Sequence, residues 1–178
     1  MKYILLLISQ IMGYKILDYA TTSKEQAFKF CPFIDTRVID HVFDITNDIR
    51  ATTDYNFMYN NDENTKLTIC NENLLDGQKA YLKTTLNKVG TFETVSKKEI
   101  YVDNSLLTND NNLYNVLHHE IVHCIGLDHS DKKGIMNYSL IMDQDDKSDT
   151  SSVVADTFKT WLSQDDVDGI NFLQKGVK

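Results

Sequence analysis

The stretch His118-His119-Glu120-Ile121-Val122-His123-Cys124-Ile125-Gly126-Leu127-Asp128-His129-Ser130 holds four of the five histidines of this 178-residue chain. His119 and His123 stand four positions apart, so on a helix their imidazoles share one face, with Cβ atoms about 5–6 Å apart. Gly126 can adopt the positive φ that ends a helix, and the following turn can bring His129 back toward the other two. The spacing therefore predicts a helix that ends just before Gly126 and a turn that gathers three imidazoles.

Three neutral imidazoles around one ion indicate a catalytic zinc rather than a structural zinc. Structural sites fill all four positions with protein ligands, whereas His119, His123 and His129 leave the fourth position for water. Zinc lowers the pKa of such a water to about 7 and polarises a carbonyl oxygen. Glu120 is the candidate general base, which takes a proton from the attacking water and returns it to the leaving amine.

The remaining histidines and the three cysteines are not assigned as ligands. His118 falls outside the motif and is expected on a solvated helix face, and His41 is the lone histidine of the first predicted helix. Cys31, Cys70 and Cys124 form no C-x-x-C pair, which argues against a zinc ribbon and allows at most one disulfide. We expect Cys124 in the core, and Cys31 and Cys70 as buried thiols, or as a single bridge if the protein is exported.

Outside the motif, the hydrophobic spacing alternates between helical and strand periods. Apolar residues at helical spacing predict a first helix from Asp35, a second over 110–125 and a short last helix after the capping-box sequence Ser163-Gln164-Asp165-Asp166. Between the first two helices, four short segments rich in β-branched and aromatic residues predict strands: Tyr55–Tyr59, Lys66–Cys70, Lys79–Leu86 and Glu99–Val102. Residues 139–160 show no periodicity and are expected to form an irregular surface loop.

The composition is that of one globular domain, with 42% hydrophobic and 25% charged residues and no linker or repeat. Acidic residues (26) outnumber basic ones (18), and the net charge of −8 repels nucleic acids and anionic lipid surfaces. Met1–Gly13 carries a short apolar run that suits either a secretory signal peptide or a first buried strand. Residues 14–178 then form a single domain, and no other stretch is long enough to cross a membrane.

The extended histidine motif, followed by Gly134-Ile135-Met136-Asn137-Tyr138, resembles the metzincin zinc metalloproteases. Ser130 and the Leu162–Ile170 segment are similar to the matrixins, the matrix metalloproteinase branch. The resemblance implies an α+β domain with a mixed twisted sheet, two long helices and a small C-terminal subdomain with a short helix. It also implies that Met136 forms a hydrophobic floor beneath the zinc, and that the Asp165-Asp166 pair ties the last helix to the active-site region.

Some features depart from the matrixin pattern. No histidine lies between His41 and His118, so the second, structural zinc of the family is not expected. Calcium sites of the family are not recognisable, and the acidic segment Asp143–Asp149 reads either as an ion site or as a solvated loop. The residues around Cys31 lack the pattern of the pro-segment cysteine that keeps matrixins latent, which favours synthesis without a zymogen form.

Tyr138 stands two positions beyond Met136, with Asn137 between them. This offset resembles astacins and serralysins, in which the tyrosine approaches the zinc and can donate to the tetrahedral oxyanion. Tyr138 is therefore a candidate catalytic residue, and simple packing in the wall of the cleft is the alternative.

These features predict a zinc-dependent endopeptidase with one catalytic zinc. A peptide substrate is expected to lie extended along an edge strand, Ala80–Leu86, and to come from an extracellular or host protein. The protein is expected to be a secreted monomer, or cytoplasmic if residues 1–13 stay attached. Two alternatives remain open: a non-catalytic binding module that keeps the zinc as a staple, against which Glu120 counts, and an intracellular processing metallopeptidase.

Overall fold

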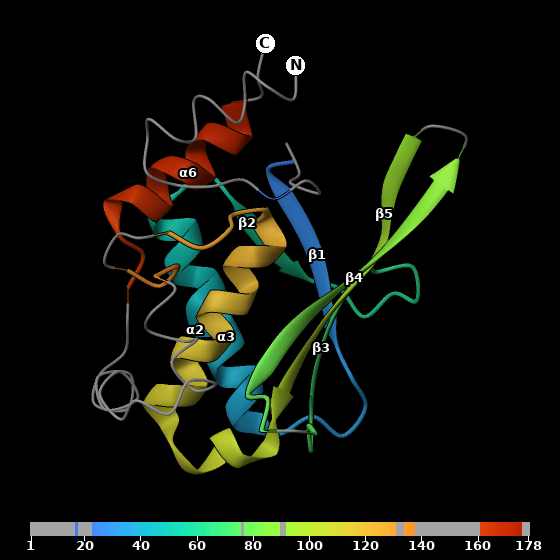
Figure 1. Cartoon of the computed structure of the whole chain (residues 1–178), viewed down its shortest axis with the longest axis vertical. Coiled ribbons are helices and arrows are strands. Elements are labelled where there is room, and N and C mark those ends of the chain that lie inside the picture. The colour runs from blue at the N-terminus through green and yellow to red at the C-terminus, as the bar shows by residue number, and fades with distance from the viewer. Residues whose placement is uncertain are drawn as a thin grey trace.

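A five-stranded sheet packs against two long helices in the computed structural model, which describes residues 17, 23–75, 77–89, 92–130, 134–137 and 161–175. Both long helices cover one face of the sheet, and the last helix lies beyond the end at which α3 finishes (Figure 1). In chain order the elements are β1 (Glu25–Phe30), α2 (Thr36–Thr52), β2 (Asn56–Tyr59), β3 (Leu67–Glu72), β4 (Ala80–Val89), β5 (Phe92–Asp103), the 3-10 turn η1 (Asn104–Thr108), α3 (Asp110–Ile125) and α6 (Gln164–Lys175).

The sheet is mixed, with strand order β2-β1-β3-β5-β4. β4 runs antiparallel to β5, whereas the other neighbouring strands run parallel. β4 is therefore an edge strand of the described sheet. It contains Ala80–Leu86, the strand that is predicted to pair with the substrate. The predicted α+β class with a mixed sheet is confirmed, and no helix in the described ranges is long and apolar enough to cross a bilayer.

The predicted elements differ from the observed ones mainly in their limits. The predicted strands omitted β1, Glu25–Phe30, in which polar and apolar side chains alternate only over Phe28-Lys29-Phe30, too short a run to indicate a strand. β5 begins at Phe92 rather than Glu99, and β4 continues to Val89 rather than Leu86. β4 and β5 continue to pair with each other where no third strand joins them. Many residues of this part are polar, so the hydrophobic pattern did not predict that the strands continue there.

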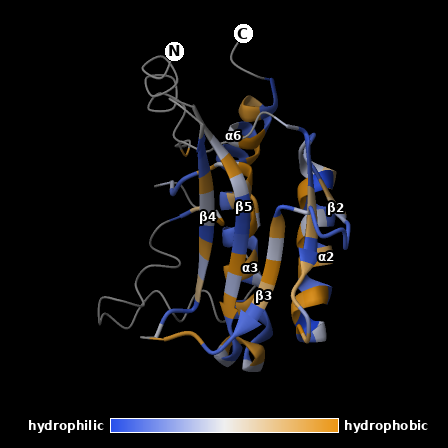
Figure 2. Cartoon of the chain, turned by 90° about the vertical axis from the view of Figure 1, so that its right-hand side faces the viewer, coloured by the Kyte–Doolittle hydropathy of each residue, from blue (hydrophilic) through white to orange (hydrophobic). Residues whose placement is uncertain are grey.

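The core lies between the sheet and the two long helices. The apolar stripe of α2 is fully buried, as predicted, and it belongs to one core cluster with apolar side chains of α3 and the central strands. Figure 2 shows hydrophobic positions along α2 and the strands of the sheet. Each such side chain contributes roughly 1.5–3 kcal/mol of burial free energy. The main members are Val38, Val42, Ile45 and Ile49 of α2, Leu113, Leu117 and Ile121 of α3, and Leu67, Ile69, Ile100 and Val102 of the sheet.

The prediction that His118 is solvated is wrong, because its exposed fraction is only 1%. His118 lies edge-on to Tyr114, with ring centroids 5.6 Å apart. The Tyr114 hydroxyl donates to Asp48 of α2, at 2.8 Å, and Tyr114 also contacts the ring of His41. This second face of α3 therefore packs against α2, a contact that the periodicity of α3 alone does not reveal.

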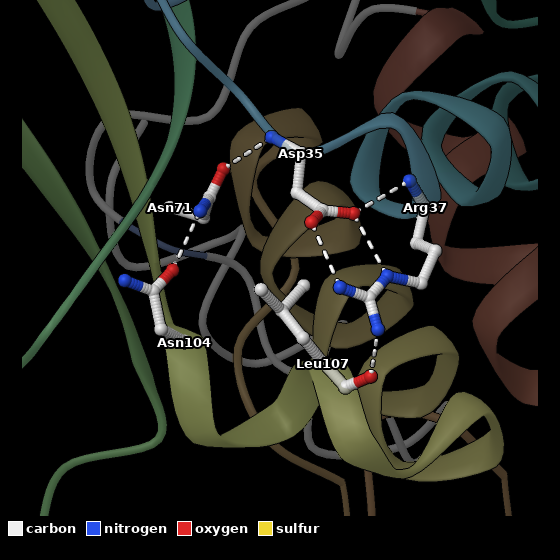
Figure 3. A network of polar contacts seen from close by, with 5 residues as sticks. All are labelled: Asp35, Arg37, Asn71, Asn104 and Leu107. Atoms are coloured by element: carbon white, nitrogen blue, oxygen red, sulfur yellow. Dashed lines mark hydrogen bonds and ion pairs between the residues drawn. The ribbon is translucent and has the colours of Figure 1, made fainter.

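Two sets of links hold the start of α2 to the sheet. Asp35 caps α2, and its backbone N–H donates to Asn71 of β3 at 2.8 Å, while the Arg37 guanidinium binds the Asp35 carboxylate (Figure 3). A disulfide joins Cys31 to Cys70 close by. The expectation of two buried thiols is thus corrected in favour of the single bridge, whereas Cys124 is a buried free thiol, as expected.

Candidate metal centre

Three imidazoles converge where α3 ends. His119 and His123 project from α3 and His129 from the turn beyond it, and one nitrogen of each lies within 4.8 Å of those of the others. The Nε2 atoms of His119 and His129 are 3.1 Å apart. Two nitrogens bound tetrahedrally to one zinc are about 3.3–3.4 Å apart at normal Zn–N distances. In the described part of the chain this is the sole cluster with metal-binding spacing, and it does not include His41 or His118.

Hydrogen bonds select the form of the two helical histidines that can bind a metal. The Nδ1 atom of His119 lies 2.8 Å from the carbonyl oxygen of Ile135, and that of His123 lies 2.7 Å from the carbonyl oxygen of Leu127. A carbonyl oxygen only accepts, so each Nδ1 carries the proton and each Nε2 keeps its lone pair. This carbonyl orientation is typical of metal-ligating histidines, and the donor set therefore fits a zinc ion.

Gly126 makes the turn that returns His129 to the helix. Its φ of 119° is left-handed, as predicted for the C-cap, and its N–H donates to the carbonyl oxygen of His123 at 3.0 Å. A side chain would strain this conformation. The backbone N–H of His129 then donates to the Asp128 carboxylate at 2.8 Å, which steadies the residue after the turn.

Burial sets the protonation of the site. It lowers the pKa of His119 well below its ordinary value, and neighbouring His123 lowers it further. Burial likewise lowers the pKa of His123 to about 4, so both imidazoles are neutral at pH 7, the form that binds metals. For Glu120, burial raises the pKa to about 7, although a hydrogen bond from the backbone of Leu82 in β4 opposes the rise.

The segment 134–137 packs beneath this end of α3. Met136 is fully buried, and its carbonyl oxygen accepts from the backbone N–H of Ser130 at 2.7 Å. The Ser130 hydroxyl donates to Asp165 at the start of α6, at 3.0 Å. Asp166 accepts from the backbone N–H and hydroxyl of Ser163, both at 2.8 Å, and lies beside Gly134. The Asp165-Asp166 pair thus links α6 to this segment, as the resemblance implied.

Comparison with known proteins gives a family assignment. The sequence matches the matrixin family profile over residues 23–174. The chain belongs to the matrixin family. It is therefore a member of a family of zinc metalloproteases. No curated protein matches the sequence significantly. A solved structure described as "GM1 bound form of the ECX AB5 holotoxin" matches with a TM-score of 0.52 at 13% identity, covering 91% of this chain and 84% of that one. At that identity the match shows a shared fold alone.

This matrixin has a buried lysine beside the centre that sequence reasoning missed. Lys98 of β5 is 4% exposed, and its Nζ donates to the carbonyl oxygen of Cys124 in the last turn of α3. A cation is favourable at this negative end of a helix, although burial lowers the pKa of Lys98. The sequence did carry a signal for this. Lys98 stands two positions before Ile100 and four before Val102, so in a strand all three side chains lie on the same, buried face of β5.

Several predictions for this matrixin lie outside the described residues and stay predictions. They are the signal peptide or first strand at Met1–Gly13, the loop at 139–160 with its acidic segment Asp143–Asp149, and the catalytic role of Tyr138. The role of Met136 as a floor beneath zinc also stays a prediction, as do the expected lack of a second zinc and the monomeric state.

Proposed function

We propose that this matrixin is a zinc-dependent endopeptidase in which His119, His123 and His129 hold one zinc ion and Glu120 is the general base. The observation that carries the proposal is the position of Glu120. Its carboxyl group is buried next to His119, within the helical turn that carries two of the three imidazoles, and burial raises its pKa to about 7. A carboxyl group with such a pKa can both take up and release a proton at neutral pH.

Each residue then has a defined task. Bound zinc supplies a Lewis acid and a water of lowered pKa. Glu120 holds the proton removed during attack on the peptide carbonyl and delivers it to the departing amine nitrogen. The backbone of Leu82 fixes the Glu120 carboxylate through its hydrogen bond and brings the edge of β4 next to it. A peptide paired with that edge would present its carbonyl groups to Glu120.

The proposed substrates are extracellular or host proteins. The Cys31–Cys70 disulfide supports this assignment, because such bridges persist in oxidising compartments and are rare in the cytosol. It counts against the alternative of an intracellular processing peptidase. The proposed location is therefore outside the cell that makes the protein.

The test is cleavage of a mixed peptide library by purified, zinc-loaded protein. We expect a chelator to abolish cleavage, added zinc to restore it, and Glu120→Gln to reduce kcat by roughly 10²-fold or more. Glu63→Gln is the matched control, since it removes the same charge from an exposed loop and should keep full activity. If the folded protein binds one zinc and cleaves nothing, the proposal is wrong and a zinc-stapled binding module takes its place.

A further inference from the structure

The hairpin formed by β4 and β5 continues beyond the rest of the sheet. β3 pairs with β5 only from Lys98 to Asp103, whereas β4 pairs with β5 as far as Val89 and Phe92. The part that pairs Leu86–Val89 with Phe92–Val95, here termed the arm, is therefore two-stranded. Figure 1 shows it extending away from the helices.

The hydrogen-bond register shows which backbone groups of β4 face its open edge. The N–H of Asp103 donates to the carbonyl oxygen of Lys79 at 2.8 Å, so these residues form a hydrogen-bonded pair. Pairs of this type alternate along an antiparallel ladder, and the backbone groups of Leu82 and Thr84 consequently point away from β5. The hydrogen bond from the Leu82 backbone to Glu120 agrees with this direction.

The same alternation continues into the arm. Thr85 pairs with Lys97 and Leu86 pairs with Val95, so the extra residue of the β-bulge, Ser96, belongs to β5. β4 itself keeps its alternation, and the N–H and carbonyl groups of Leu86 point to the open edge as well. No strand of the described sheet pairs with β4 on that side.

We propose that the open edge of β4 within the arm, Leu86–Val89, is an additional substrate subsite, which pairs with the peptide upstream of the scissile bond. This inference rests on the proposed endopeptidase function. The reacting carbonyl must lie near Glu120, hence beside Leu82. Antiparallel pairing is more stable per residue than parallel pairing, and a peptide paired in this way with β4 runs its N-terminal side toward Val89. Leu86 lies four residues beyond Leu82, so it pairs with a residue about four positions before the one that carries the reacting carbonyl, which is about the fifth residue before the scissile bond.

The side chain of Leu86 adds a preference at that position. It is one of the exposed large hydrophobic residues of the protein, with an exposed fraction of 46%. Side chains of paired residues lie on the same face of a ladder, so an apolar peptide side chain there would cover Leu86. The favoured substrate is accordingly an extended segment that has no proline near this position and carries an apolar residue about five places before the cleaved bond.

The experiment measures kcat/KM for peptides with one cleavage sequence and two, four or six residues before the scissile bond. We expect a gain of about tenfold or more from two to six upstream residues, as two or more added backbone hydrogen bonds and one buried side chain would supply. Downstream residues can pair with β4 only as far as Ala80, where the strand begins, so extending the downstream side beyond that point should give no comparable gain. N-methylation of the single upstream residue, near the fifth before the bond, whose N–H faces Leu86 should remove the gain in the wild-type protein, so this test needs no protein variant.

Two variants test the edge directly. Leu86→Pro removes an N–H that faces the open edge without breaking the β4–β5 ladder, and should lower the long-to-short ratio of kcat/KM toward one. Val95→Pro is the matched control, since it removes an N–H from the opposite edge of the arm and should keep the ratio. Equal kcat/KM for short and long wild-type substrates would overturn the subsite while leaving the peptidase intact. Failure of zinc-loaded wild type to cleave any peptide would overturn both.

Discussion

The Nδ1 atom of His119 donates to the carbonyl oxygen of Ile135, 2.8 Å away, and so joins a proposed zinc ligand to a segment sixteen residues later in the chain. The backbone N–H of Ile135 in turn donates to the carbonyl oxygen of Trp161, at 3.2 Å. The orientation of the imidazole therefore depends on the packing of segment 134–137 against the start of α6. Changes in that packing should affect metal binding without altering any ligand.

Zinc should stabilise the folded protein through all three histidines. A ligand present at a thousand times its Kd adds about 4 kcal/mol to the unfolding free energy, so added zinc should raise Tm. His129→Ala should remove most of this shift in a thermal unfolding scan of chelator-stripped protein. His41→Asn, although it changes a buried residue and lowers the starting Tm, should keep the shift. An unchanged zinc response in His129→Ala would argue against the assigned ligand set.

Gly134→Ala should lower the unfolding free energy and the zinc affinity more than Gly77→Ala does. A Cβ at Gly134 would lie 2.6 Å from both an Asp166 carboxylate oxygen and the Ser163 Cβ, and the φ of 154° is unfavourable for alanine. Gly77 also has a positive φ, of 75°, but has open space around it. Gly77→Ala should therefore cost about 1 kcal/mol. Gly134→Ala should cost clearly more and weaken zinc binding, as chemical denaturation and zinc titration would show; equal costs would contradict the tight packing at Gly134.

Reduction of the Cys31–Cys70 disulfide should destabilise the protein. The bridge closes a loop between residues 39 positions apart, and such bridges typically contribute about 2–4 kcal/mol. The double variant Cys31→Ser/Cys70→Ser should lower the unfolding free energy by this amount. Adding a reductant should lower it in the wild type and leave the double variant unaffected, because Cys124 is unpaired and buried. A wild type that shows no response to reductant would exclude a stabilising bridge.

The cap of α2 should give a stability contribution that disappears in acid. Hydrogen bonds from the Arg37 side chain and backbone lower the pKa of Asp35 to about 2. Because the pKa is lowered in the folded state, this stabilisation is present above the ordinary pKa near 4 and is lost as the pH falls toward 2. Asp35→Ala should therefore cost about 1 kcal/mol at pH 6 and progressively less below pH 4. Urea unfolding at several pH values measures the difference, and a pH-independent cost would rule out the ionised cap.

Features that depend on neighbours along the chain were predictable from the sequence. The four-residue spacing of His119 and His123 sets their common face once a helix forms, and Gly126 marks where that helix must end. The buried stripe of α2 follows in the same way from apolar residues three and four positions apart. These relationships involve one or two helical turns, whose geometry is nearly the same in every protein.

Features that depend on contacts between distant segments were not predictable in this way. His118 is buried because α2 packs on that side of α3, Cys31 meets Cys70 because β1 and β3 are neighbours, and Lys98 is buried because β5 passes the end of α3. The raised pKa of Glu120 likewise comes from burial against residues remote in sequence. Hydrophobic spacing records which face of an element is apolar, but burial, pairing and protonation depend on which other segment covers that face, and this is settled only when the whole chain packs.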